Sequence, residues 1–171
     1  MIIGKRIKLE ELNADMVSDT YVAWLNDPKV NKYLESRYVS HTMETCKDFV
    51  QSVQDDENSV MFAIFELESG THIGNVKLAE INRRYKRAEI GILIGDQNVW
   101  GRGYAREAIQ LLEEYAKSQL SLRRITAGCY DCNERSVSLF ESMGYKREGV
   151  FVEHFIFEGR YVDSIRMGKL I

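Results

Sequence analysis

The chain has 171 residues, of which 44% are hydrophobic and 29% charged, and this composition predicts one globular domain over residues 1–171. A formal net charge of −3 gives no sign of the basic surface that nucleic-acid binding requires. No apolar run approaches the roughly 20 residues that cross a bilayer, and the N-terminus lacks a secretion-signal layout, so we expect a cytoplasmic protein without a membrane partner.

The first half of the chain predicts a strand, two helices and three further strands. "KRIKLEEL" alternates in polarity, as is typical of a strand over residues 5–12, and apolar residues at helical spacing predict a helix over 15–27. Hydroxyl residues near Thr42 provide N-cap candidates for a second helix that runs to about Gln54. Three apolar runs predict antiparallel strands, the first two joined by an "ESGT" hairpin turn, at residues 60–67, 72–81 and 87–95.

The second half alternates helices and strands. Apolar residues three and four apart predict a helix from near Arg102 to near Leu120. "RRITAGCY" predicts a strand, "ERSVSLFESM" a helix that ends at Gly144, and the last residues two strands joined by "EGR". This order predicts an α/β (α+β) fold in which helices flank a mixed, mostly antiparallel central sheet with one parallel crossover.

The stretch "VWGRGYAREA" places two glycines where a strand gives way to a helix. Glycine is costly in regular structure, so its position indicates that backbone shape matters at this junction. Either the glycines only shape a tight turn, or consecutive N–H groups face one phosphate at the positive end of the helix. The spacing fits neither the P-loop nor the dinucleotide fingerprint. We expect the phosphate cradle at Gly101, Arg102, Gly103, Tyr104 and Ala105.

Four stretches resemble the GNAT family of acetyl-CoA-dependent N-acetyltransferases: "WGRGYAREA", the N-x-x-S segment that starts at Asn133, "SMGYKREG" and "GRYVDSIRMGKL". The chain looks similar to the branch of ribosomal-protein N-terminal, spermidine and amino-sugar acetyltransferases. The family's phosphate loop is Q/R-x-x-G-x-G/A, from which Asn98 departs at the first position. The resemblance implies the GNAT fold, acetyl-CoA as co-substrate and a small-molecule amine as acceptor, and it leaves a homodimer open.

The resemblance also implies roles for the strand "EIGILIG". This strand is expected to splay from the strand after the crossover helix, so that Ile92, Leu93 and Ile94 pair with the pantetheine arm. Glu89 is the candidate general base, because a carboxylate near a cleft can have its pKa raised toward neutrality. The alternative for Glu89 is a solvated carboxylate at the strand end, paired with Arg87.

The sequence offers several candidates for the proton donor to the departing thiolate. Many relatives carry a tyrosine in the helix after N-x-x-S, where this chain has Phe140, which cannot donate a proton. Ser136 is the candidate substitute. Asn133 and Ser136 are also expected to bind the cofactor, and the serine could instead cap the helix. Tyr130, Tyr145 and solvent are the other candidate donors.

The acceptor site is expected within residues 24–42, at Glu35, Arg37, Tyr38 and His41. "YVAWLNDPKVNKYLESRY" looks like the N-terminal part of acetyltransferases that act on an amino sugar carried by a nucleotide, and an arginine and a tyrosine suit its phosphate and base. A polyamine would require a denser acidic pocket. A polyamine and a protein N-terminus stay open as acceptors, and the missing tyrosine keeps a non-catalytic acyl-CoA-binding module open.

The three cysteines, Cys46, Cys129 and Cys132, are expected to be free thiols. Cys129 and Cys132 have the spacing of half a zinc site, but no second such pair exists and the histidines are scattered. We therefore expect no metal.

Overall fold

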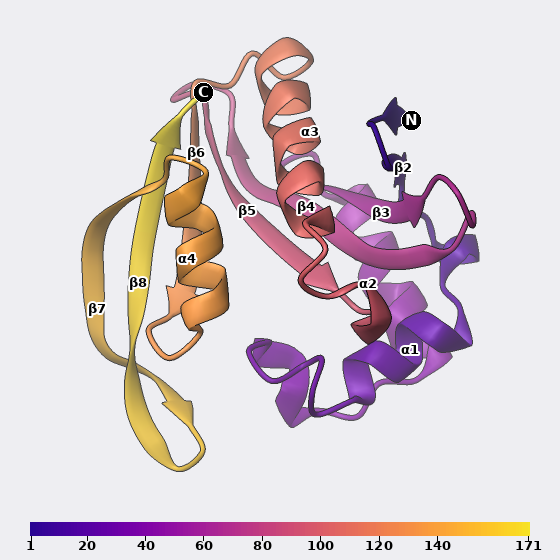
Figure 1. Ribbon diagram of the computed structural model, residues 1–171, viewed down its shortest axis with the longest axis horizontal. Coiled ribbons are helices and arrows are strands. Elements are labelled where there is room, and N and C mark those ends of the chain that lie inside the picture. The colour runs from indigo at the N-terminus through magenta and orange to yellow at the C-terminus, as the bar shows by residue number, and fades with distance from the viewer.

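The computed structural model describes residues 1–171, and one eight-stranded sheet runs through them in the order β1-β2-β3-β4-β5-β6-β8-β7 (Figure 1). All neighbouring strands are antiparallel except β5 and β6, which are parallel and joined through α3. The mixed, mostly antiparallel sheet with one crossover is confirmed. The strands are β1 (Ile2–Ile3), β2 (Ile7–Glu11), β3 (Val60–Glu66), β4 (His72–Asn82), β5 (Arg87–Ile94), β6 (Arg124–Tyr130), β7 (Lys146–Phe157) and β8 (Arg160–Leu170).

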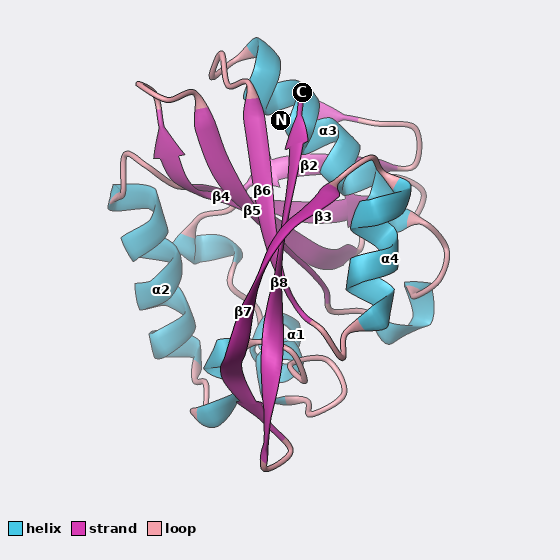
Figure 2. Cartoon of the chain, turned by 90° about the vertical axis from the view of Figure 1, so that its left-hand side faces the viewer, coloured by secondary structure: helices cyan, strands magenta, loops and turns pink.

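Four α-helices flank the sheet, with α2 on one face and α3 and α4 on the other (Figure 2). They are α1 (Asp19–Asn26), α2 (Met43–Asp55), α3 (Tyr104–Ser118) and α4 (Glu134–Ser142). Short 3-10 turns lie at Ala14–Met16, Glu35–Tyr38 and Gln97–Val99. No helix is both long and apolar enough to cross a membrane.

Two helix starts differ from the sequence prediction. The helix expected over residues 15–27 begins only at Asp19, because the Ser18 hydroxyl caps it by accepting a hydrogen bond from the Tyr21 N–H. The helix expected from near Arg102 begins at Tyr104, because Gly103 has left-handed backbone with φ of 84°. The short strand β1 was not predicted.

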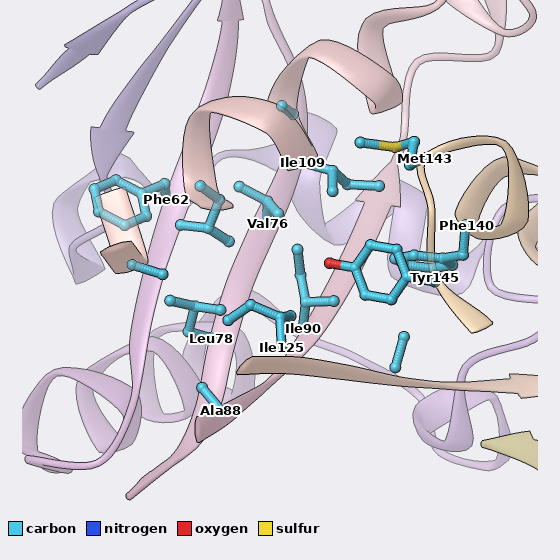
Figure 3. Close-up of a cluster of buried hydrophobic side chains, with 14 of the residues drawn as sticks. Phe62, Val76, Leu78, Ala88, Ile90, Ile109, Ile125, Phe140, Met143 and Tyr145 are labelled. Carbon is cyan, nitrogen blue, oxygen red and sulfur yellow. The ribbon is translucent and has the colours of Figure 1, made fainter. Parts of the chain in front are cut away.

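The main hydrophobic core lies between the sheet and the two helices α3 and α4 (Figure 3). Fully buried residues of it include Val76 on β4, Ile109 on α3 and Ile125 on β6. A second, smaller core joins α1 and α2 to the opposite face, with Tyr21 and Val50 at its centre. The central strands of the sheet are therefore covered on both faces and form a fixed frame for the site, whereas most residues of β7 are exposed.

The frame opens between β5 and β6. These strands pair only over three residues, up to Glu89 opposite Thr126. Beyond that point β5 pairs with β4 alone, and Figure 1 shows β5 and β6 diverging from the end where they pair. The predicted splay is confirmed, and the edge of β5 that faces β6 has no strand partner from Ile90 to Ile94.

Candidate active site

The connection from β5 to α3 presents unpaired N–H groups. Gly101 and Gly103 both have left-handed backbone, with φ of 74° and 84°. The Arg102 N–H donates to the Val99 carbonyl, so the predicted cradle does not include it. The N–H groups that donate to no protein oxygen belong to Gly101, Gly103, Tyr104, Ala105 and Arg106. Five donors at the positive end of a helix of 15 residues form the kind of site that binds phosphate.

The N-terminal segment holds this loop in place. Glu107, in the first turn of α3, accepts hydrogen bonds from the backbone N–H groups of Lys5 and Arg6, at 2.7 and 2.8 Å. Burial opposes ionisation of Glu107, but hydrogen bonds from Arg6 and Lys5 outweigh it and lower the pKa of the carboxyl. Arg6 Nη1 also donates to the Arg102 carbonyl at 2.8 Å. Asn98, at the variant position of the loop, donates to Asp96 in the preceding turn.

Glu89 lies where the β5–β6 ladder ends and pairs with Arg166 of β8. Arg166 Nη1 lies 3.3 Å from one carboxylate oxygen, and Nη2 contacts the other. The ion-pair partner of Glu89 is thus Arg166 and not Arg87. Gly128 leaves room for the pair, because a Cβ there would collide with the guanidinium. The carboxylate, about one third exposed, keeps lone pairs for a further donor.

Asn133 and Ser136 both lie at the start of α4. Asn133 caps the helix by accepting a hydrogen bond from the Ser136 N–H at 3.3 Å, so the alternative of a serine cap is wrong. Ser136 Oγ instead lies 3.3 Å from Cys129 Sγ on β6. Burial raises the pKa of the Cys129 thiol, so at neutral pH this group is a neutral partner for the serine.

The aromatic residues near α4 belong to the core. Phe140 is only 3% exposed, and its ring packs edge-on against Tyr145, with centroids 4.9 Å apart (Figure 3). Burial raises the pKa of Tyr145, whose hydroxyl is closed off from solvent. Tyr145 is therefore poorly placed to donate a proton in the gap.

A cavity of about 460 Å³ lies on the opposite face of the sheet, between α1, α2 and strands β3 to β5. It reaches β5 at Gly91, Ile92 and Leu93. The cavity therefore adjoins the segment of β5 whose edge toward β6 has no strand partner. Nine of its 16 lining residues are hydrophobic, and none carries a carboxylate. Of the four predicted acceptor residues, only His41 lines it.

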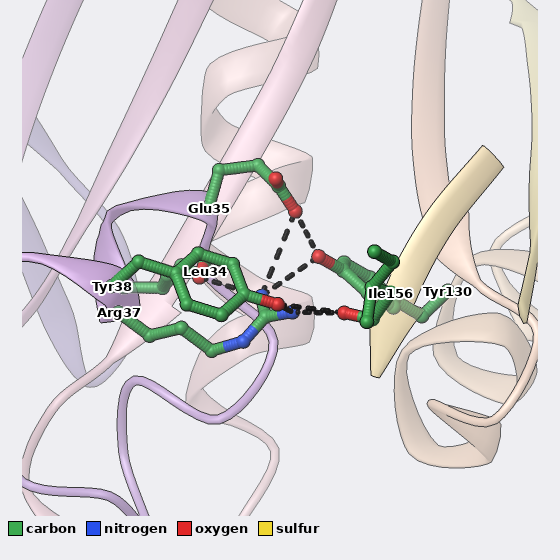
Figure 4. Close-up of polar contacts among 6 residues, drawn as sticks. All are labelled: Leu34, Glu35, Arg37, Tyr38, Tyr130 and Ile156. Atoms are coloured by element: carbon green, nitrogen blue, oxygen red, sulfur yellow. Dashed lines mark hydrogen bonds and ion pairs between the residues drawn. The ribbon is translucent and has the colours of Figure 1, made fainter. Parts of the chain in front are cut away.

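The other three predicted acceptor residues form a network that joins the turn Glu35–Tyr38 to β6 and β7 (Figure 4). Arg37 donates to the Tyr130 hydroxyl at 2.8 Å and to the Ile156 carbonyl at 2.9 Å, and Tyr38 donates to the same carbonyl. The Tyr130 hydroxyl donates to Glu35. Because Ser36 and Val39 line the cavity, this network fixes one of the cavity's walls.

Three residues of the candidate site were not identified from the sequence. Asn75 and Lys77, two apart on β4, line the cavity, and their signal was polar side chains on one face of the apolar strand "HIGNVKLAEI". Arg166 carried no signal, because its partner Glu89 lies 77 residues away in the chain.

The cysteines are free thiols, as predicted, with Cys46 and Cys129 buried and Cys132 exposed. No three His, Cys, Asp or Glu side chains come together as metal ligands would.

His72, beside the cavity, makes the stability of the protein depend on pH. Burial lowers the pKa of His72 below its ordinary value of 6.5, although hydrogen bonds with Asn75 and Gly74 partly oppose this. Below pH 6.5 the unfolded chain therefore binds more protons than the folded one, and the free energy of unfolding falls as the pH falls. We expect the Tm to drop between pH 7 and pH 5, about where an ordinary histidine titrates, and to drop less in His72→Gln.

Thermal unfolding of both proteins across this range tests the prediction. The carboxyls whose pKa values the fold lowers, such as Glu66 and Glu107, have an ordinary pKa of 4.5 and therefore lose their contribution only at lower pH. Parallel pH profiles for the two proteins would contradict a role for His72.

Comparisons with known proteins agree with this geometry. A family model described as an acetyltransferase (GNAT) domain matches residues 6–146. The uncharacterized N-acetyltransferase p20 of Bacillus licheniformis is 30% identical over 149 residues, which cover 85% of this chain and 83% of that protein. The spermidine N(1)-acetyltransferase of Vibrio cholerae is 38% identical over 95 residues, 56% of this chain and 54% of that enzyme. A crystal structure of V. cholerae spermidine N-acetyltransferase with CoA and spermine matches with a TM-score of 0.87 and 27% identity, covering 96% of this chain and 95% of that one.

Proposed function

The chain belongs to the GNAT acetyltransferase family, and we propose that it transfers the acetyl group of acetyl-CoA to the primary amine of a small molecule, an amino sugar carried on a nucleotide. It is an acyltransferase with acetyl-CoA as co-substrate. One observation carries the proposal. Five unpaired N–H groups lie at the start of α3, and residues 95–100 connect them to β5, whose edge toward β6 has no strand partner beyond Glu89. A phosphate site and a peptide-like site therefore follow each other along the chain.

The residues present fit both ends of the co-substrate. The unpaired N–H groups of Gly101 and of residues 103–106 bind the pyrophosphate, with the positive end of α3 behind them. The edge of β5 from Ile94 back to Ile92 has no strand partner and binds the amide groups of the pantetheine arm as a neighbouring strand would. The Ile94 carbonyl already accepts a hydrogen bond from the Trp100 indole N–H, at 2.8 Å, so Ile92 supplies the free carbonyl. This path leads from the loop toward Glu89, where the gap closes.

The co-substrate supplies a thioester carbonyl, and the chain supplies proton transfer around it. Glu89, held by Arg166, accepts a proton from the amine nitrogen, whose lone pair forms the new C–N bond. When the C–S bond breaks, the electron pair stays on sulfur, and Ser136 or solvent returns a proton to the thiolate. The Cys129 S–H can donate to Ser136 Oγ, which leaves the serine hydroxyl hydrogen for the thiolate.

Ser136→Ala tests the role of the serine. If Ser136 donates the proton, kcat falls while the KM for acetyl-CoA stays unchanged. The fall in kcat is about 10-fold, because solvent can donate the proton in place of the serine. Steady-state kinetics at varied acetyl-CoA measure both constants, with Ser138→Ala, on the same helix, as a matched control. A raised KM with unchanged kcat would instead assign the serine to co-substrate binding.

The cavity supports the choice of acceptor. It contains no carboxylate, which disfavours a polyamine, and it contains one lysine, which suits a phosphate-bearing substrate. Residues 21–38 also resemble enzymes that act on nucleotide-linked amino sugars. The relatives named spermidine acetyltransferases keep a polyamine as the second candidate.

The test is release of free thiol from acetyl-CoA with an amino-sugar nucleotide, spermidine and a short peptide assayed side by side. We expect the highest kcat/KM with the amino-sugar nucleotide. Preference for spermidine or the peptide would overturn the choice of acceptor. Binding of CoA without thiol release from any amine would overturn the activity and indicate a binding module.

A further inference from the structure

Asn75 is a buried side chain with an unused donor. It is 2% exposed, lines the cavity, and its Nδ2 has no hydrogen-bond partner. Most buried polar groups in folded proteins are satisfied, so an unpaired amide beside a cavity points to an acceptor that arrives with a ligand.

The orientation of this amide is fixed by His72. The His72 Nε2 atom lies 3.0 Å from the Gly74 carbonyl oxygen and 2.9 Å from Asn75 Oδ1. A carbonyl only accepts, so Nε2 must carry the hydrogen, and the Asn75 atom facing it must be the oxygen. The rings of Tyr21, Trp24 and Phe65 pack around His72 and hold it there. The NH₂ group of Asn75 is therefore the one left without a partner.

Lys77 adds a positive charge on the same face of β4. It lines the cavity and makes no ion pair or hydrogen bond with any carboxylate, and its Nζ lies 5.5 Å from the centre of the Phe49 ring. Gly91 lies opposite Lys77 on β5, and a Cβ at Gly91 would meet nothing within 4 Å. Open space thus lies beside an unpaired cation.

We infer that Asn75 and Lys77 select acceptors that carry an anionic oxygen group, a carboxylate or a phosphate, at a distance from the reacting amine. This rests on the proposed function, because the amine must reach the open edge of β5. Lys77 lies on β4, one strand spacing of about 4.8 Å away from β5 and on the side opposite that edge. The amine and the anionic group are therefore separated by several bonds.

The test compares amines that differ in the group at the end of the molecule opposite the amine. The probes are 6-aminohexanoate, 6-aminohexyl phosphate and hexylamine, with glycine as an amine whose carboxylate is too close. We expect kcat/KM to be at least about 10-fold higher for the two anionic six-carbon amines than for hexylamine, because a charge-assisted hydrogen bond is gained. Comparing the two anionic probes shows whether carboxylate or phosphate is preferred.

Two variants connect the preference to these residues. In Lys77→Met the ratio of kcat/KM between 6-aminohexanoate and hexylamine falls toward 1, and Lys77→Arg restores it. Asn75→Asp keeps the oxygen that His72 needs and reverses the preference through repulsion. Lys47→Met, which removes an exposed lysine of α2 outside the cavity, keeps the wild-type ratio. If Asn75→Asp does not fold, the lysine variants carry the test.

An unchanged ratio in Lys77→Met, or a wild-type preference for hexylamine or glycine, would overturn the inference while leaving the acetyltransferase activity established. If no amine releases thiol, the proposed function fails, and the inference is then tested by binding alone. Equilibrium titration of 6-aminohexanoate and hexylamine into the CoA-bound protein and its Lys77→Met variant gives the same comparison. Equal affinities in the wild-type protein would overturn it.

Discussion

A Gly103→Asp variant is expected to bind CoA about 100-fold or more weakly than the wild-type protein, a loss of about 2.7 kcal/mol. The new carboxylate stands among the unpaired N–H groups of the loop, where it repels the pyrophosphate and competes for the same donors. Calorimetric titration with CoA measures the effect. The fold has room for the change, because a Cβ at Gly103 meets only Arg6 Nη2, at 3.4 Å.

Gly159→Asp is the matched control. Gly159 also has left-handed backbone, with φ of 77°, and a Cβ there meets nothing within 4 Å. It lies in the turn between β7 and β8, so it imposes the same strain and charge away from the loop. Unchanged CoA affinity in a folded Gly103→Asp variant would contradict the phosphate assignment.

The second large effect is expected at Glu89. Glu89→Gln keeps the size of the side chain and removes the base, so turnover should fall by about 100-fold or more at pH values below the pKa of the acceptor amine. At higher pH the amine loses its proton without help, and the difference should shrink. The pH–rate profile of kcat/KM measures this.

Glu148→Gln controls for the loss of an ion pair. Glu148 pairs with Arg124 on the same sheet at similar exposure, away from the open part of the gap. Its profile should match that of the wild-type protein. If Glu89→Gln also matches, Glu89 serves only to hold Arg166.

The order of the elements was predictable because it follows local signals, whereas the splay of β5 was expected from the resemblance to the GNAT family. Hydrophobic periodicity predicts every strand and helix except the two-residue strand β1, and the two glycines before Tyr104 mark the turn into α3. Boundaries shifted where one side chain decides, as at Ser18, whose hydroxyl starts α1. The extent of the domain and the roles of the site residues stay predictions.

The acceptor side was less predictable because its contacts are long-range. Arg37 and Tyr38 have the chemistry of a binding site, but they are engaged with Tyr130 and Ile156, about 90 to 120 residues away in the chain. Composition cannot show such partners. Asn75 is recognisable in the sequence as a polar residue on an apolar strand. Only the structure shows that its side-chain NH₂ group has no hydrogen-bond partner.

An amide-resolved NMR titration of the isotope-labelled protein with CoA tests the binding of the co-substrate most directly. We predict the largest shifts at the unpaired N–H groups of Gly101 and of residues 103–106, and along β5 from Ile92 to Ile94, where the edge has no strand partner. Shifts concentrated elsewhere, or none at millimolar CoA, would contradict the assignment of this loop and edge as the acetyl-CoA site.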